Sequence, residues 1–126
     1  MRQIILSNSV KAFYFNREVV LNKLKEISKE ALNIFPEIIE IRLIGSFAKN
    51  EESGLSDIDL FIITKSEEKN PLERIKPYYM WFAEKIEISL DLIAATKQEP
   101  QLNDNFRKMI KGSILLAKSL YLRLEE

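Results

Sequence analysis

The stretch that decides the fold is IGSFAKNEESGLSDIDLFI, residues 44–62. It continues into a run, DIDLFIIT (residues 57–64), in which β-branched and aromatic residues predict a β-strand. Alternate side chains of a strand point to opposite faces, so Asp57 and Asp59 share one face. The apolar residues that alternate with them point to the other face, where we expect them to pack in a core.

The rest of the chain predicts helices and strands that alternate around this stretch. In chain order, we expect a helix over 17–33 with Asn16 as its cap, a strand over 37–44, a short helix over 46–51 closed by Gly54, the strand over 57–64, a helix from Asn70 toward Glu84, a strand over 86–94, and a helix from Asn103 or Asp104 to about Lys111. This order predicts an α/β (α+β) domain, in which a sheet is covered by helices and loops at one end are available for a site.

Three segments are less regular. Pro77 lies inside a predicted helix and predicts a kink or a later start. The run from Tyr78 to Phe82 holds five large apolar side chains, so one or two should be exposed or docked on a partner; the simpler interpretation is that they cover the sheet and ordinary surface. The tail after Gly112 stays unassigned. Residues 116, 120, 121 and 124 have helix-like spacing there and could pack on the first helix or serve self-association.

Composition limits the chemistry. The 126 residues fit a single domain over 1–126 and leave no room for a separate recognition domain. Lys plus Arg equals Asp plus Glu at 19 each, so the basic excess of a general nucleic-acid binder is missing. The sequence has no cysteine and no histidine, which excludes disulfides, thiolate chemistry, imidazole bases and metal sites built on either residue. The chemistry must therefore use carboxylates, hydroxyls, amines and backbone groups.

We expect neither a signal peptide nor a membrane span in this sequence. Its start, MRQIILSNSVKAF, has only a short apolar run and does not resemble a signal peptide. No stretch approaches the ~20 apolar residues that a membrane span requires. We therefore expect a cytoplasmic protein that makes no use of a membrane.

Asp57 and Asp59 are the first candidates for chemistry. Two carboxylates on one face repel each other, and burying them is costly unless they share a cation. Proteins bind Mg²⁺ through a few carboxylates together with substrate phosphates. The pair therefore predicts a magnesium platform. The plainer alternative is that Asp57 caps a turn and Asp59 is an exposed strand residue.

Gly45, Ser46 and Lys49 are candidates for phosphate binding, because they follow a predicted strand directly and open a short helix. Glycine lets the backbone approach a ligand closely, and the Ser46 hydroxyl and the free amides of a helix start can hold a phosphate. Lys49 could add a further contact. Alternatively, Ser46 caps a plain strand-to-helix turn and Lys49 is an ordinary surface lysine.

Asp91 supplies a third carboxylate, from the run EISLDLIAA. If its strand neighbours that of Asp59, the two side chains reach the same pocket. Three carboxylates suit a two-metal phosphoryl-transfer site with the ions ~4 Å apart, and Asp91 could then polarise or deprotonate an incoming hydroxyl. The alternative is an edge-strand acid in a surface salt bridge.

Together these residues form a motif in two parts: Gly45-Ser46, ten intervening residues, then Asp57-x-Asp59, with a later strand aspartate. The motif resembles the minimal nucleotidyltransferases of the DNA polymerase beta superfamily, over roughly residues 39–116. The sequence departs from the family pattern after Gly-Ser, where Phe47 and later Asn50 replace a frequent basic residue and a glycine.

The resemblance implies a small mixed β-sheet flanked by helices, ATP as donor, and two Mg²⁺ ions. It places Gly45 and Ser46, with Lys49 as a further candidate, on the triphosphate. It implies that Asp57, Asp59 and Asp91 are the catalytic carboxylates and the metal ligands.

Stand-alone domains of this size resemble the partners of HEPN-type proteins, four-helix RNases that act as toxins. In those type VII toxin–antitoxin pairs, the nucleotidyltransferase is the antitoxin and adenylylates a tyrosine of the toxin. The resemblance therefore implies a protein adenylyltransferase with a helical partner, and a homo- or hetero-oligomer.

Three alternatives stay open. The chain could be a catalytically silent module that neutralises a partner by docking, which the intact acids argue against. It could be a nucleotidyltransferase that acts on a small molecule or an RNA end, which neutral charge and the lack of a second domain argue against. An Asp-x-Asp glycosyltransferase is a weaker rival, because such catalytic domains are usually much larger.

Overall fold

The computed structural model describes residues 17–48, 57–86, 89–97 and 103–120, and the fold below is that of these residues. Four strands form one mixed sheet in the order β3-β2-β1-β4. Their bounds are Ile38–Ile44 for β1, Ile58–Thr64 for β2, Leu90–Thr96 for β3 and Ile114–Lys118 for β4. Strand β1 is antiparallel to both of its neighbours, whereas β2 and β3 are parallel.

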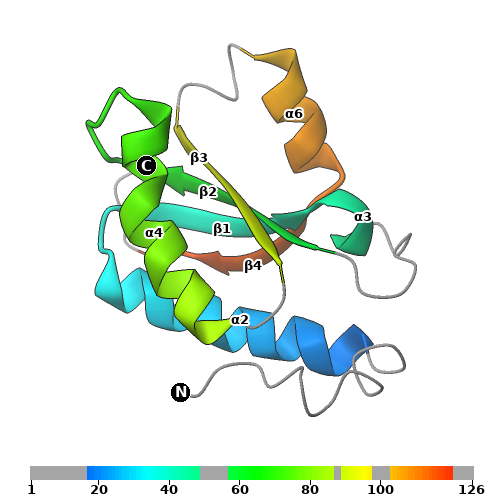
Figure 1. The fold of residues 1–126 in the computed structure, drawn as a ribbon. Coiled ribbons are helices and arrows are strands. Elements are labelled where there is room, and N and C mark those ends of the chain that lie inside the picture. Colours follow the sequence, from blue (N-terminus) through cyan, green and yellow to red (C-terminus); the bar gives the residue numbers. More distant parts are fainter. Residues whose placement is uncertain (1–16, 49–56, 87–88, 98–102, 121–126) are drawn as a thin grey trace.

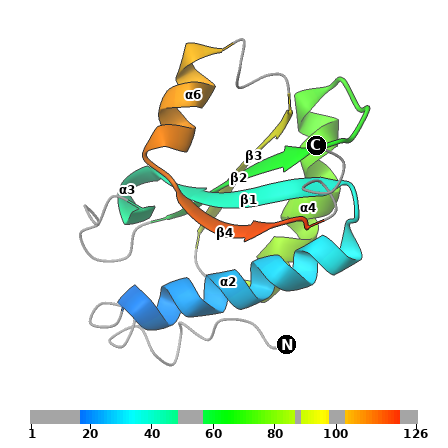
Figure 2. The same cartoon turned by 180° about the vertical axis from the view of Figure 1, so that it is seen from behind.

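Helices cover both faces of the sheet (Figure 1, Figure 2). Helices α2 (Arg17–Ile34) and α4 (Pro71–Lys85) pack on one face, and α6 (Asp104–Lys111) packs on the other. The short α3 (Gly45–Ala48) follows β1 directly. None of the helices in the described ranges has the length and hydrophobicity needed to cross a membrane.

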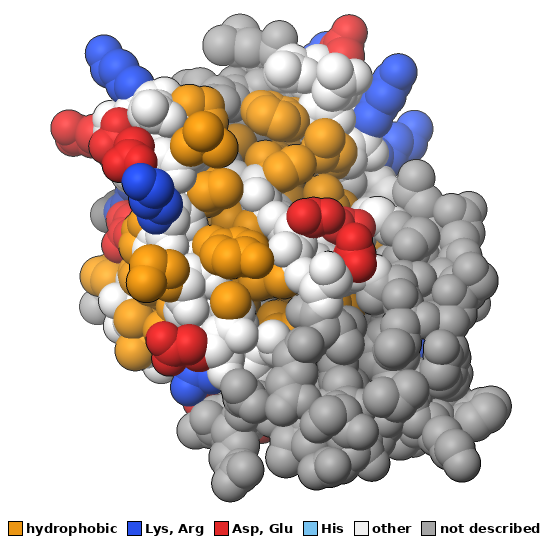
Figure 3. All heavy atoms as spheres, in the orientation of Figure 1, with side chains coloured by type: hydrophobic (Ala, Val, Ile, Leu, Met, Phe, Trp, Pro, Cys, Tyr) orange, Lys and Arg blue, Asp and Glu red, His pale blue; other side chains and the backbone are white. Residues whose placement is uncertain are grey.

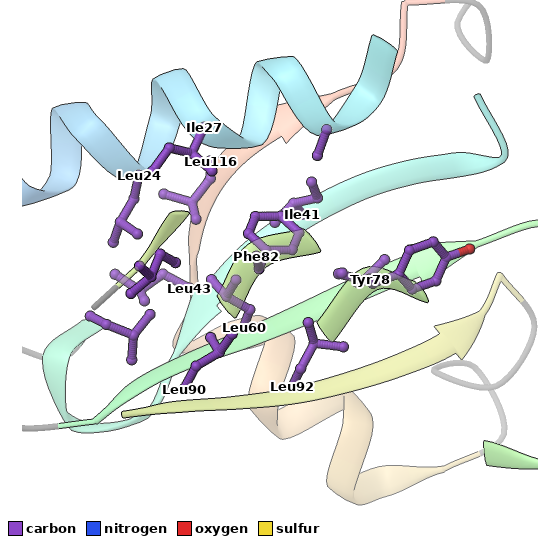
Figure 4. Close-up of a cluster of buried hydrophobic side chains, with 14 of the residues drawn as sticks. Leu24, Ile27, Ile41, Leu43, Leu60, Tyr78, Phe82, Leu90, Leu92 and Leu116 are labelled. Carbon is purple, nitrogen blue, oxygen red and sulfur yellow. The ribbon is translucent and has the colours of Figure 1, made fainter. Parts of the chain in front are cut away.

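The larger core lies between the sheet and the helices α2 and α4 (Figure 4). Helix α2 contributes a buried apolar stripe of Val20, Leu24, Ile27 and Ala31, spaced about one helical turn apart. A smaller core on the opposite face joins Phe61 of β2 to Phe106 of α6, whose ring centroids are 5.6 Å apart. Strand β2 is thus buried on both faces, which accounts for its almost unbroken apolar sequence.

Most predicted elements are confirmed within one or two residues. Helix α4 begins where the cap predicts, because Asn70 Oδ1 accepts from the backbone N–H of Leu72 at 2.9 Å. The later start expected from Pro77 is wrong, since the helix runs through this exposed proline to Lys85. The proposed cap Asn16 and the closing Gly54 lie outside the described residues.

Two boundaries differ from the sequence prediction. The third strand begins at Leu90 rather than at residue 86, because the N–H of Ile86 bonds to Phe82 O and closes α4. Where the structure describes the tail, its helix-like spacing does not correspond to a helix. Leu116 lies in strand β4, where it is buried against the core that α2 covers, because β4 pairs with the edge of β1 that β2 leaves free.

A hydrogen-bonded group centred on the buried Tyr78 lies at the end of the sheet where β2 ends. The Tyr78 hydroxyl donates to Glu37 Oε2 at 2.8 Å and lies 2.9 Å from Thr64 Oγ1. The Tyr78 ring packs edge-on against Phe35, with centroids 5.0 Å apart. Burial, chiefly, raises the pKa of Tyr78 to about 12, opposed by the Thr64 hydrogen bond and reinforced by Glu37.

We predict that Tyr78→Phe lowers the free energy of unfolding by about 1–2 kcal/mol, because Glu37 and Thr64 lose a buried partner. The pKa of Tyr78 is higher in the folded chain than its usual 10.0, so the wild type should lose stability as pH rises from 10 toward about 12. The variant should lack this part of the pH dependence. Urea unfolding measures both effects. Tyr79→Phe on the exposed side of α4 is the matched control, and an equal loss in both variants would contradict the network's role.

Candidate functional site

The described candidates Gly45, Asp57, Asp59 and Asp91 lie at one end of the sheet, where β1 ends and both β2 and β3 begin. Ile44, the last residue of β1, pairs with Asp59, and Asp59 pairs in turn with Asp91. Because β2 and β3 are parallel and in register, Asp59 and Asp91 lie side by side on the face that α6 partly covers. The condition set from sequence, that the strand of Asp91 neighbours that of Asp59, is met.

Gly45 turns the chain from β1 into α3 directly against Asp59. Its φ of +82° is a conformation that residues with a side chain rarely adopt. A Cβ at this position would lie 2.2 Å from Asp59 Oδ2. Glycine is therefore required twice at this position: for the turn, and for the space that the carboxylate occupies.

The carboxylates of Asp59 and Asp91 are close enough to disturb each other. Partial burial, the charge of Asp91, a side-chain hydrogen bond with Asp91 and the charge of Asp57 together raise the pKa of Asp59 from 3.8 to about 6. Asp57 and Asp91 are exposed, and Asp59 is partly buried between them and Gly45. A cation shared by these groups would relieve the repulsion.

The donor set is suited to Mg²⁺, since carboxylate oxygens are its usual protein ligands. Asp59 and Asp91 are already paired, and Asp57 is near enough for its charge to act on Asp59. In the ranges that the structure describes, however, no three acidic side chains are gathered closely enough to hold a metal ion by themselves. The chemistry of the donors fits the ion. The role of all three as ligands stays a prediction, and further ligands would come from substrate phosphates.

The candidate phosphate-binding residues are described only in part. Gly45 and the backbone of Ser46 lie in α3, whereas Lys49 falls outside the described residues. Sequence reasoning missed Arg17, whose Nη2 donates to Ala48 O at 3.1 Å and joins the start of α2 to the end of α3. No local pattern could have shown this contact, because the two residues are 31 positions apart.

Sequence reasoning also missed a polar group on β1, on the same face of the sheet as Asp59. Arg42 forms an ion pair with Glu40, and its Nη1 donates to Ser113 Oγ at 3.0 Å. Ser113 Oγ in turn donates to Ile110 O at 2.6 Å, so this group connects β1 to the junction of α6 and β4. The sequence signal for this group was an acidic and a basic residue, Glu40 and Arg42, two positions apart on a predicted strand.

Comparison with known proteins bears on the fold and the family of the chain. The fold is shared with a candidate nucleotidyltransferase from Sulfolobus solfataricus, solved at 1.40 Å resolution: the TM-score is 0.59 at 24% identity, over 82% of this chain and 86% of that chain. The sequence matches the family described as polymerase beta, nucleotidyltransferase, over residues 22–119. The chain belongs to this nucleotidyltransferase family, which confirms the resemblance seen in the motif and the predicted fold class.

Two further comparisons add little. A toxin–antitoxin structure with AMP-PNP has a TM-score of 0.49 at 13% identity, over 77% of this chain and 75% of that chain, a likeness too weak to carry an argument. No curated protein matches the chain.

We predict that Gly45→Ala lowers the free energy of unfolding by about 1–3 kcal/mol, because the new methyl group and the positive φ both force Asp59 or the turn to move. Gly112→Ala is the matched control, since Gly112 ends α6 with a φ of −96° that alanine adopts freely. Urea unfolding compares the two variants. Equal midpoints for Gly45→Ala and the wild type would show that the close approach to Asp59 is not a constraint.

We also predict that Asp59→Asn stabilises the metal-free protein near neutral pH. The raised pKa means that the folded chain binds a proton more tightly than the unfolded chain, so wild-type stability falls as pH rises from about 4 through about 6. The variant removes this loss, a gain of about 1 kcal/mol after allowance for solvent screening. Unfolding in EDTA at both ends of this range measures it, with exposed Glu67→Gln as control. A gain that is the same at both pH values would contradict the assignment.

Proposed function

We propose that this chain is a Mg²⁺-dependent nucleotidyltransferase that transfers AMP from ATP to a hydroxyl group of a protein. The observation that carries the proposal is the meeting of Gly45, Asp59 and Asp91 at one end of the sheet, with Asp59 Oδ2 in the space beside the glycine. Membership of the nucleotidyltransferase family supports the reaction class.

In the proposed reaction, an acceptor oxygen attacks the α-phosphorus of ATP, and the bond to the β-phosphate breaks to release pyrophosphate. Asp91 is exposed at the start of β3 and would accept the proton of the acceptor hydroxyl. Asp57 and Asp59, with Asp91, would hold Mg²⁺, which when bound supplies charge stabilisation to the attacking and leaving oxygens.

The other end of the nucleotide would lie against α3. Gly45 lets the backbone approach the phosphates closely, and Ser46 and Lys49 are the further candidates there. Arg17 would act as a positioning residue, because its hydrogen bond to Ala48 O anchors the end of α3 to α2. This role for Arg17 needs no contact with the nucleotide.

The acceptor that we propose is a tyrosine of a HEPN-type helical toxin, with this chain as its antitoxin. Support comes from the resemblance of this chain, in its motif and its size, to the stand-alone nucleotidyltransferase domains that partner HEPN-type proteins. The exposed apolar side chains of α4 also favour a protein partner: Tyr79 and Met80 are 41% and 66% exposed, although their neighbours Tyr78 and Phe82 are buried. The expectation that one or two side chains of this run are exposed is confirmed.

A second candidate is a module that docks on its partner without chemistry. It is favoured by one observation, that the three aspartates do not form a closed metal site among the described residues. The same partner would bind in both cases, so only transfer distinguishes them.

The test is incubation with ATP, Mg²⁺ and a co-expressed helical partner, followed by intact mass measurement of the partner. We expect a gain of one or more AMP units, reduced at least about 100-fold in rate by Asp57→Asn/Asp59→Asn or Asp91→Asn and abolished by EDTA. Asp104→Asn, an exposed aspartate on α6, is the control that should transfer normally. A partner that binds with unchanged mass would favour the docking module, and transfer that survives the double substitution would rule out this site.

A further inference from the structure

The two edge strands of the sheet, β4 and β3, differ in the features that discourage pairing with a further strand. Strand β4 has five residues, ends at Lys118, and pairs with β1 across an irregularity in register at Ile41/Arg42. Shortness, an edge lysine and a bulge all discourage a further strand from pairing. Strand β3 has seven residues, no lysine, arginine or proline, and an unbroken register with β2. It therefore lacks these protections.

The hydrogen-bond pattern shows which groups of β3 face outward. Ile58 N–H donates to Ser89 O at 2.9 Å, and residues of a parallel strand alternate in pairing, so the N–H and C=O of Leu90, Leu92 and Ala94 point away from β2. The Ala94 carbonyl is already taken, because Arg74 Nη1 donates to it at 3.0 Å. Beyond Leu90 and Leu92, the described residues supply no further strand. The open half of the edge is thus the half that carries Asp91.

An apolar surface adjoins this open half. Helix α2 packs toward β4 and β1, whereas α4 packs over β3 (Figure 1). Trp81 of α4 faces the end of α2, with its ring 6.2 Å from that of Phe35. Tyr79 lies on the opposite side of the helix turn from Trp81, so it faces the β3 edge, and it is 41% exposed. Figure 3 shows hydrophobic side chains gathered over this face, with acidic side chains at their margin.

We propose that the open half of β3 binds an extended segment of the acceptor protein as an added strand, through the backbone groups of Leu90 and Leu92. This inference rests on the proposed function, in which Asp91 receives the proton of the acceptor hydroxyl. The occupant is a loop or terminal segment of a protein, because backbone pairing requires a peptide and the adjoining flank of α4 is apolar. Because Arg74 occupies the carbonyl of Ala94, the added strand would pair with Leu90 and Leu92, the residues on either side of Asp91.

The geometry also specifies the sequence pattern of this segment. Asp91 lies on the face of the sheet that α6 covers, whereas Leu90 and Leu92 belong to the core on the α4 face. Side chains of an added strand alternate in the same way. A hydroxyl-bearing residue level with Asp91 therefore has its two neighbours on the α4 face, on the side of Tyr79. We infer that the acceptor residue is flanked on both sides by apolar residues.

The first test measures binding alone, without ATP or Mg²⁺. The probe is the capped peptide Lys-Thr-Val-Tyr-Val-Thr-Lys, titrated into the labelled protein and followed by amide NMR signals. We expect the signals of Leu90 and Leu92 to shift. Two forms of the peptide, N-methylated at one or the other set of alternate amides, should differ in affinity roughly tenfold or more, because only one set faces β3. Equal affinities, or no shift at millimolar peptide, would overturn the proposal.

A variant pair tests the apolar flank. Tyr79→Thr should weaken peptide binding roughly threefold to tenfold, whereas Ile34→Thr, at another exposed apolar position at the end of α2, should leave it unchanged. Leu90 and Leu92 signals that shift with protein concentration alone, together with a dimeric native mass, would show that a second copy occupies the edge and would overturn the proposal.

Failure of the edge and failure of the proposed function are distinguishable. Peptide that binds at Leu90 and Leu92 but never gains AMP when ATP and Mg²⁺ are added would support the edge site and contradict transfer to proteins. AMP transfer that is equal for both N-methylated forms would support transfer and overturn the edge site.

Discussion

The site depends on a contact between a glycine and a carboxylate. Asp59 Oδ2 occupies the space that a side chain at position 45 would fill, so the end of β1 and the start of β2 can approach only because residue 45 is a glycine. That approach sets where α3 begins and hence where a nucleotide could lie. The in-register pairing of β2 with β3 places Asp59 beside Asp91, and the resulting repulsion is part of what raises the pKa of Asp59. The site is therefore built around an unfavourable interaction, which a shared cation would relieve.

The scaffold can hold such an interaction because β2 is anchored on both faces. Leu60 and Ile62 belong to the core under α2 and α4, while Phe61 and Ile63 belong to the core under α6. A strand packed on both faces cannot shift by one residue without exchanging its two sets of side chains. Asp59 is consequently fixed in register with both Ile44 and Asp91.

The features that the sequence predicted correctly depend mostly on residues close together in the chain. The spacing of Asp57 and Asp59 within an apolar run predicted the strand and the shared face, and the cap at Asn70 predicted the start of α4. What could not be read depended on tertiary partners. Strand β4 forms because β1 offers it an edge, although the residues from Leu116 onward have helix-like spacing, and β3 starts late because Ile86 closes α4. The contact of Arg17 with Ala48 has no sequence signal at all.

The sheet order has a consequence for how the chain reaches this fold. Strand β1 is central, yet its second neighbour is β4, so residues 38–44 are synthesised early and receive residues 114–118 only after nearly all the rest of the domain. Until then one edge of β1 and the core position of Leu116 are open on a nascent chain. Non-local pairing of this kind slows folding and leaves a strand edge available to neighbouring chains. The described sheet is therefore complete only after β4 has been translated and has paired with β1.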